Sequence, residues 1–174
     1  MAHDILIVDD EADIRMLIAG ILNDEGMKTR EAADADQAFA QVAARRPSLV
    51  ILDIWLQGSR LDGLQILEQL MRDHQNLPVI MISGHGNIET AVSAIKVGAY
   101  DFIEKPFKAD RLLLMVDRAI EAARLKRENE ELKLRAGGEA ELIGRSSAIN
   151  QVRQSIEKVA PTGSRVLITG PAGS

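Results

Sequence analysis

The stretch Asp4-Ile5-Leu6-Ile7-Val8-Asp9-Asp10 decides the fold of this 174-residue chain. Four apolar residues in a row, closed by carboxylates, are typical of a buried strand in a parallel sheet. Two later runs repeat the pattern and end in a polar residue: Leu49-Val50-Ile51-Leu52-Asp53 and Val79-Ile80-Met81-Ile82-Ser83. A fourth run, residues 100–104, leads into Lys105-Pro106. Parallel strands end at one edge of their sheet, so we expect these polar residues to meet there.

Amphipathic segments alternate with the apolar runs over the first 120 or so residues, a pattern that predicts a doubly wound α/β fold. We expect five parallel strands in the order 2-1-3-4-5. The helix after the last strand contains no Pro or Gly from Asp110 to about Ala136, which predicts a long C-terminal extension. The strands are expected at the residue ranges 4–9, 27–31, 48–53, 78–83 and 100–104.

The predicted sheet edge carries groups suited to a magnesium and phosphate site. Asp9, Asp10 and Asp53 would repel one another unless a cation joined them, and Mg²⁺ prefers such oxygen ligands. Ser83 supplies a hydroxyl and Lys105 an ammonium group, both suited to phosphate oxygens. A single Asp after a strand is more often a helix cap than a ligand. Four strand ends that all deliver suitable groups favour a site.

The composition excludes several classes of protein. The chain contains no cysteine, which rules out disulfides and thiolate metal sites and favours a cytoplasmic setting. No apolar run approaches the roughly 20 residues that span a bilayer, so we expect no membrane partner. The formal net charge is −5, and the mostly dispersed basic residues argue against direct nucleic-acid binding.

The residues at the sheet edge resemble the signature of the receiver domain of two-component response regulators, from about residue 4 to about residue 122. The motif consists of Asp9-Asp10, Asp53, Ser83 and Lys105-Pro106. The loop at residues 54–63 resembles the NtrX branch of the NtrC/NtrX family. Beyond residue 142 the sequence is similar to the start of the AAA+ ATPase of regulators that activate sigma-54 RNA polymerase.

The resemblance implies that Asp53 is a phosphoacceptor for a sensor histidine kinase, one similar to NtrY. Mg²⁺ would then be held by Asp10, by Asp53, by the backbone carbonyl of Trp55 and, directly or through water, by Asp9. The chain would act as a phosphorylation switch rather than as an enzyme. A free-standing receiver that works only as a protein-interaction switch is the alternative.

The same resemblance assigns roles to the remaining motif residues. Lys105 would pair with a phosphoryl oxygen, and a cis Lys105-Pro106 bond would aim its side chain. Ser83 would hydrogen-bond the phosphate and draw its loop inward, so that Phe102 rotates into the vacated space. A permanently buried ring is the alternative for Phe102, and His85 is either an exposed loop residue or a further neighbour of the site.

Trp55 marks one of two departures from the usual receiver pattern. It places a bulky ring near the expected phosphoryl group, and it occupies the position where an aspartyl-phosphate phosphatase carries its general acid, which disfavours that enzyme class. A dinucleotide-binding domain is disfavoured because no G-x-G-x-x-G follows the first strand. The second departure is the loop at residues 57–61, which is longer than usual and lacks Pro, so we expect it to move more.

The chain divides into three expected parts: a receiver at 1–121, a helical linker at 122–141 and the start of an ATPase domain at 142–174. The linker spaces Ala122, Leu125, Asn129, Leu132 and Ala136 by steps of three and four residues. This spacing suits a short coiled coil in a homodimer, and equally a solvated single helix.

The sequence after the linker holds only part of a phosphate-binding loop. Gly170 matches the first glycine of G-x-x-x-x-G-K-[ST], Gly173 lies at a variable position of the same loop, and the sequence ends before the lysine. A plain turn is the alternative. We therefore expect ATP binding, and contacts with sigma-54 RNA polymerase and DNA, only in a longer parent protein.

Overall fold

The computed structural model describes residues 3–84, 88–135, 144 and 146–163. It divides into two compact units, residues 1–132 and 133–174. In chain order the described elements are β1 (Asp4–Val8), α1 (Ala12–Asp24), β2 (Lys28–Ala32), α2 (Ala35–Ala44), β3 (Leu49–Asp53), α3 (Gly63–Asp73), β4 (Val79–Ser83), α4 (Ile88–Val97), β5 (Asp101–Glu104), α5 (Ala109–Arg135) and α6 (Ser147–Val159).

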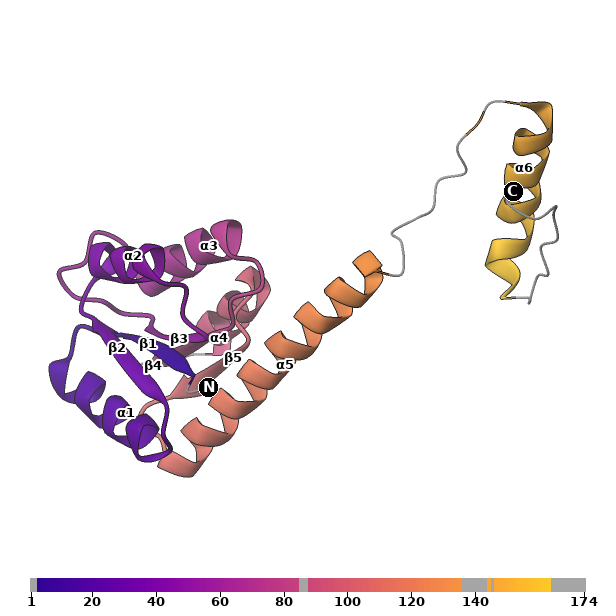
Figure 1. The fold of residues 1–174 in the computed structure, drawn as a ribbon. Helices are drawn as coiled ribbons and strands as arrows, with labels where there is room; N and C mark the ends of the chain where they lie inside the picture. The colour runs from indigo at the N-terminus through magenta and orange to yellow at the C-terminus, as the bar shows by residue number, and fades with distance from the viewer. Residues whose placement is uncertain (1–2, 85–87, 136–143, 145, 164–174) are drawn as a thin grey trace. The chain divides into compact units, whose positions relative to one another are not determined.

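The first unit is built on a five-stranded parallel sheet in the order β2-β1-β3-β4-β5 (Figure 1). This confirms the predicted fold class and strand order, and each strand begins and ends within one residue of its expected range. In the register, Val8 pairs with Leu52 and Asp53 pairs with Ile82. The ends of β1, β3 and β4 therefore lie at one level of the sheet.

Helices cover both faces of the sheet because the strand residues alternate in direction. On one face Leu6 and Val8 pack with buried residues of α2, α3 and α4, and on the other Ile5 and Ile7 pack with α1 and α5. In Figure 1, α2 and α3 lie above the sheet and α1 lies below it. β1, β3 and β4 run through the middle, so their ends are held by core on both sides.

The loop between β3 and α3 is tied to α2, which its length did not lead us to expect. The backbone N–H of Ala35, the first residue of α2, donates to the Ser59 hydroxyl at 3.1 Å. One residue further along the loop, the Arg60 guanidinium pairs with the Asp36 carboxylate. These two contacts hold the loop against the start of α2.

Gly63 closes this loop directly behind the last residues of β3. Its N–H donates to the carbonyl of Ile54 at 2.9 Å. A Cβ at this position would overlap the carbonyl oxygen of Asp53, so the close approach requires glycine. Asp62 and Gln65 then form a capping box that starts α3.

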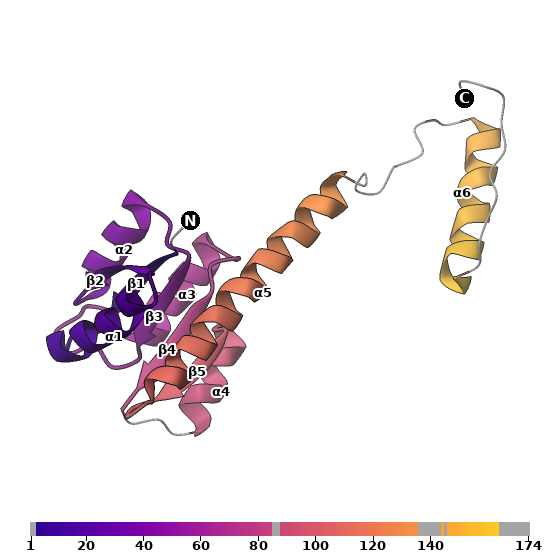
Figure 2. The same ribbon diagram turned by 60° about the horizontal axis from the view of Figure 1, so that its bottom comes forward.

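Helix α5 runs without a break to Arg135, within one residue of the predicted extent (Figure 2). Beyond the sheet it contacts the loop between α3 and β4, because the Asn76 side-chain amide donates to the Glu130 carboxylate at 2.8 Å. Leu125 and Leu132 of the predicted seam are more than half exposed. The last predicted seam residue, Ala136, lies outside the described residues.

The second unit is described at α6 and the short 3₁₀ turn Ala160–Thr162. The Ser146 hydroxyl caps α6 by accepting from the N–H of Ile149. Residues 136–141 of the predicted linker, together with Gly170 and Gly173, lie outside the described residues. Within the part of the chain that the structure describes, no helix is long and apolar enough to cross a membrane.

Candidate functional site at the carboxyl edge of the sheet

Three carboxylates converge where β1 and β3 end. Asp9 is completely buried, Asp53 is 4% exposed and Asp10 is partly exposed. One carboxylate oxygen from each lies within 4.8 Å of the others. They adjoin a crevice of about 150 Å³ lined by Asp10, Glu11, Asp53, Trp55, Gln57, Gly84 and Lys105. The sequence predicted this meeting of strand ends.

Lys105 is the cation that the structure places among these carboxylates. Its Nζ lies 2.7 Å from Asp53 Oδ2, 2.8 Å from Asp9 Oδ2 and 3.6 Å from Glu11 Oε1. The sequence led us to expect a metal between the carboxylates and Lys105 on a phosphoryl oxygen. In this structure the ammonium group itself bridges Asp9 and Asp53.

The cluster shifts the pKa values of both partners. Burial raises the pKa of Asp53 above its usual value, against the opposing effect of Lys105, and the charge of Asp9 adds to the rise. Burial acts to lower the pKa of Lys105, but its hydrogen bonds to Asp53 and Asp9 outweigh burial and raise that pKa. Lys105 therefore stays charged, while the buried, partly dehydrated surroundings of Asp53 disfavour its charged form.

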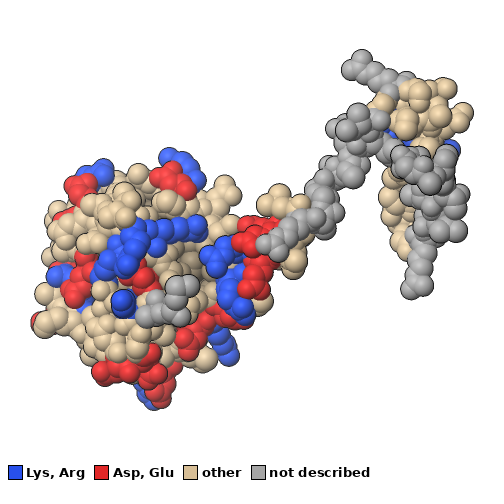
Figure 3. Space-filling view, viewed as in Figure 1, with Lys and Arg blue, Asp and Glu red and all other residues tan. Residues whose placement is uncertain are grey.

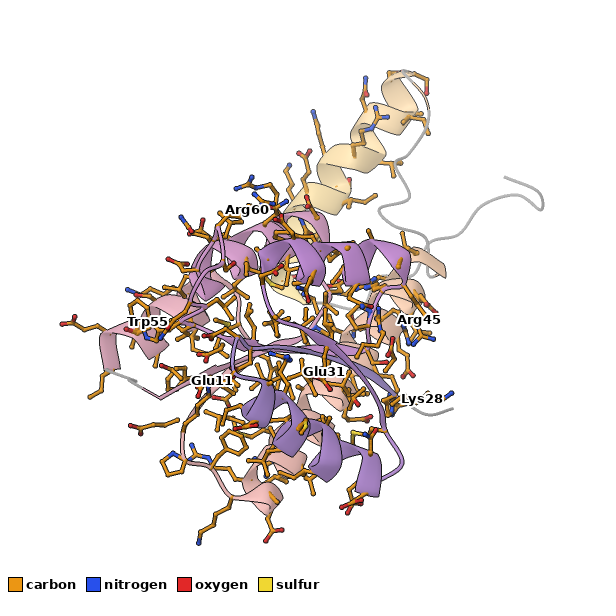
Figure 4. All side chains as sticks on the ribbon, turned by 90° about the vertical axis from the view of Figure 1, so that its left-hand side faces the viewer. Glu11, Lys28, Glu31, Arg45, Trp55 and Arg60 are labelled. Atoms are coloured by element: carbon orange, nitrogen blue, oxygen red, sulfur yellow. The ribbon has the colours of Figure 1, made fainter. Side chains whose placement is uncertain are left out.

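Backbone donors orient the two buried carboxylates. The N–H of Glu11 donates to Asp9 Oδ1 at 2.8 Å, and the N–H of Trp55 donates to Asp53 Oδ1 at 3.2 Å. The Trp55 side chain is 56% exposed on the rim of the crevice. Figure 4 shows Trp55 and Glu11 at one end of the sheet, with Lys28 and Arg45 at the other.

Arg15 of α1 supports the Asp9-Asp10 segment, and we did not anticipate it from the sequence. Its Nη1 donates to the backbone carbonyls of Asp9 at 2.7 Å and Asp10 at 3.1 Å. Its Nε donates to Glu31 of β2 at 3.0 Å. An Arg five or six residues after the acidic pair was the only available signal, and it is indistinguishable from an ordinary polar helix residue.

The remaining predicted residues lie at the same edge. Ser83 is buried at the end of β4, and its carbonyl accepts from the N–H of Lys105 at 2.8 Å. The Lys105–Pro106 peptide bond is cis, as the family resemblance implied. Phe102 is only partly buried against the core, so its ring is not enclosed. His85 lies outside the described residues.

A larger cavity, of about 300 Å³, lies at the opposite end of the strands. Its lining residues include Arg46, Arg124 and Arg127 and no carboxylate. Acidic and basic side chains are interspersed over the face of the first unit seen in Figure 3. The smaller crevice is the candidate site because it gathers the carboxylates, the ammonium group and the strand ends.

One protein-family model matches most of the chain. The model of the response regulator receiver domain matches residues 5–117. The chain belongs to the response regulator receiver domain family. Receiver domains bind Mg²⁺ at an acidic pocket and interact with histidine kinases. The oxygen donors of Asp9, Asp10 and Asp53 fit such an ion.

Similar proteins point to the NtrX and NtrC regulators within this family. The nitrogen assimilation regulatory protein NtrX of Azorhizobium caulinodans is 63% identical over 174 residues, which is all of this chain and 38% of that protein. The chain thus spans a little over a third of the length of the curated relatives it matches.

Two solved structures from Brucella abortus are similar to this chain. A crystal structure of NtrX has a TM-score of 0.82 and 65% identity, and the match covers 99% of this chain and 38% of the other. The crystal structure of the NtrX receiver domain has 69% identity and a TM-score of 0.66, and the match covers 68% of this chain and 98% of the other. The chain is therefore a receiver domain of an NtrX/NtrC-like two-component system with further sequence attached.

Proposed function

We propose that Asp53 accepts a phosphoryl group from a sensor histidine kinase and that the modification controls an attached sigma-54-dependent transcription activator. The observation that carries the proposal is the buried Asp53 carboxylate beside Asp9 and Asp10, with the Lys105 ammonium 2.7 Å away. In the transfer, a carboxylate oxygen of Asp53 forms a bond to phosphorus. The phosphorus–nitrogen bond of the phosphohistidine breaks, and its electron pair stays on the imidazole nitrogen.

The surrounding residues have roles that follow from their positions. Asp9, Asp10, Asp53 and the Trp55 carbonyl would hold Mg²⁺, which when bound neutralises charge on the phosphoryl oxygens. Lys105 brings a second positive charge from the end of β5. Transfer then depends on positioning and on charge neutralisation more than on the strength of the nucleophile.

The switch we propose begins at Ser83. A phosphoryl group on Asp53 would accept a hydrogen bond from the Ser83 hydroxyl, draw the loop after β4 inward and let the partly buried Phe102 ring follow. The changed surface would be that of α4, β5 and α5. A local negative charge would thereby be converted into a different contact face for a partner.

The output we propose lies beyond the receiver. In this proposal residues 1–121 are the receiver, 122–141 a helical linker and 142–174 the first part of an ATPase domain, with ATP bound only in the longer protein. Support comes from the NtrX relative, which aligns with all 174 residues, although they match only 38% of its length. A homodimer, an NtrY-like kinase, and sigma-54 RNA polymerase and DNA reached through further domains complete the expected partners.

Intact-mass analysis tests the central claim. The purified chain, incubated with acetyl phosphate and Mg²⁺, should gain the mass of one phosphoryl group, and Asp53→Asn should gain none. Omitting the metal should prevent the gain in the wild type. A phosphoryl adduct on Asp53→Asn, or an undiminished adduct in the presence of a chelator, would refute the assignment.

A further inference from the structure

We propose that Arg15 is a positioning residue of the metal site. Its guanidinium group would hold the backbone of Asp9 and Asp10 in the conformation that directs their carboxylates into the crevice. The proposal rests on the proposed function, because it concerns the Mg²⁺ that Asp9, Asp10 and Asp53 would hold. It assigns to α1 a part of the site that lies outside the receiver motif.

The contacts of Arg15 fix two consecutive peptide groups. One nitrogen, Nη1, donates to the carbonyl oxygens of both Asp9 and Asp10, at 2.7 and 3.1 Å. The guanidinium plane is set in turn by the bond from Nε to Glu31, and the side chain is only 16% exposed. A planar group held at both ends cannot follow a rotation of the peptide between Asp9 and Asp10.

These bonds act on the carboxylates through the backbone. Asp9 Oδ1 already accepts a hydrogen bond from the N–H of Glu11. The turn at residues 9–11 is therefore held by this internal bond and by the bonds from Arg15 to its carbonyl groups. Asp10 is only partly buried, and no hydrogen bond to its carboxylate is present among the described residues. The direction of the Asp10 side chain therefore depends on its backbone, which Arg15 fixes.

Glu31 has a second effect, on charge. A free guanidinium beside the acidic pair would repel a divalent cation and weaken its binding. The Arg15–Glu31 ion pair supplies the hydrogen-bond donors without a net positive charge. The carboxylate cluster thus keeps its attraction for Mg²⁺.

Arg15→Lys separates geometry from charge, because lysine keeps the positive charge but cannot bridge two carbonyls and Glu31 together. Arg30→Lys is the matched control. The Arg30 side chain is 17% exposed. From the middle of β2 it makes a two-bond contact with Asp4, at the start of β1, plus bonds to the backbone. Both substitutions remove a comparable network, and only one of them lies at the crevice.

The measurement is the Kd for Mg²⁺, by calorimetry and by the fluorescence of Trp55, the only tryptophan and a lining residue of the crevice. Arg15→Lys should raise the Kd about tenfold, in line with losses at residues that orient metal ligands. Arg30→Lys should leave the Kd unchanged, although both variants should melt at lower temperature in EDTA than the wild type.

A third variant, Glu31→Gln, tests the effect of charge and serves if Arg15→Lys fails to fold. It leaves Arg15 uncompensated and should raise the Kd about threefold, an effect that salt should reduce. An unchanged Kd in Arg15→Lys, or equal weakening in Arg15→Lys and Arg30→Lys, would overturn the proposal. If the wild type itself bound no Mg²⁺, the metal site of the proposed function would fail instead.

Discussion

Asp53 is almost completely buried, and its proposed chemistry requires it to be ionised. Burial and the neighbouring charge of Asp9 raise its pKa, which means that the folded state disfavours the carboxylate relative to the unfolded chain. Lys105 offsets this effect only in part. In the absence of metal, the charge on Asp53 therefore lowers the stability of the receiver.

We accordingly expect Asp53→Asn to stabilise the metal-free protein at neutral pH. The pKa of Asp53 is higher in the folded state than in the unfolded state. The carboxyl group therefore gives its full stabilisation below the unfolded pKa of 3.8 and loses it as pH rises through the folded pKa. The variant should melt about 2–4 °C higher at pH 7.5 in EDTA. This difference in melting temperature should vanish near pH 3.8.

Thermal melts at several pH values check this, and Mg²⁺ supplies the control. Added Mg²⁺ should raise the melting temperature of the wild type more than that of Asp53→Asn, because the variant lacks one ligand. A variant less stable than the wild type at pH 7.5 in EDTA would contradict the sign of the pKa shift.

The sequence predicted the position of Asp9, Asp53, Ser83 and Lys105 because each is the last residue of a strand, or the next one, and the sheet fixes where the strands end. It did not reveal that Lys105 bridges Asp9 and Asp53, because the two bonds join residues that are 96 and 52 positions apart. Arg15 was missed for a different reason. Its partners at the site are backbone carbonyls, which every residue carries, so no side-chain pattern marks them.

At the scale of the secondary-structure elements, the connection from β3 to α3 is tightly constrained. At Gly63 the chain passes so close to the Asp53 carbonyl that a methyl group cannot fit. Gly63→Ala should therefore push β3 or α3 aside and destabilise the receiver by about 3 kcal/mol, a typical cost of overpacking. Denaturant unfolding measures the loss.

Gly20→Ala in α1 is the matched control for this prediction. Apart from the adjoining residues and backbone of α1 itself, no atom lies within 4 Å of a Cβ at this position, and the residue is exposed. Alanine should therefore stabilise the receiver by about 0.5–1 kcal/mol. Equal effects of the two substitutions would show that the close approach at Gly63 relaxes easily.

The order of the elements followed from the alternation of apolar runs and amphipathic segments, and the extent of α5 followed from its lack of Pro and Gly. The ties that hold the long loop to α2 could not be predicted. Ser59 and Arg60 meet Ala35 and Asp36 only because the sheet brings this loop and the start of α2 together. The same is true of the bond from Asn76 to Glu130, which spans 54 residues.

Across the whole molecule, α5 is the element that continues from the receiver into the following sequence. Glu130 faces the loop between α3 and β4, since it accepts a hydrogen bond from Asn76. At 100° per residue, Leu125 and Leu132 project from the other side of the helix. The predicted seam is thus open to a second copy of the chain.

We expect this seam to strengthen a homodimer. Leu132→Ser should raise the dissociation constant of the dimer about tenfold, which corresponds to about 1.4 kcal/mol. Leu134→Ser is the matched control, because Leu134 is 77% exposed against 63% for Leu132 but lies on the side of Glu130. Analytical ultracentrifugation measures the dimer dissociation constants of both variants. Equal constants would show that the helix acts only as a spacer.

The unbroken course of α5 also makes the number of its residues significant. Each residue inserted between Ala123 and Leu132 would turn all later side chains by about 100° about the helix axis and advance them by about 1.5 Å. One added residue would carry Leu132 away from the side on which Leu125 lies, whereas seven would return it almost to its original phase. Natural variation in the length of this helix should therefore occur in whole heptads, or in steps of three or four residues, because other steps change the angular setting of whatever the helix carries.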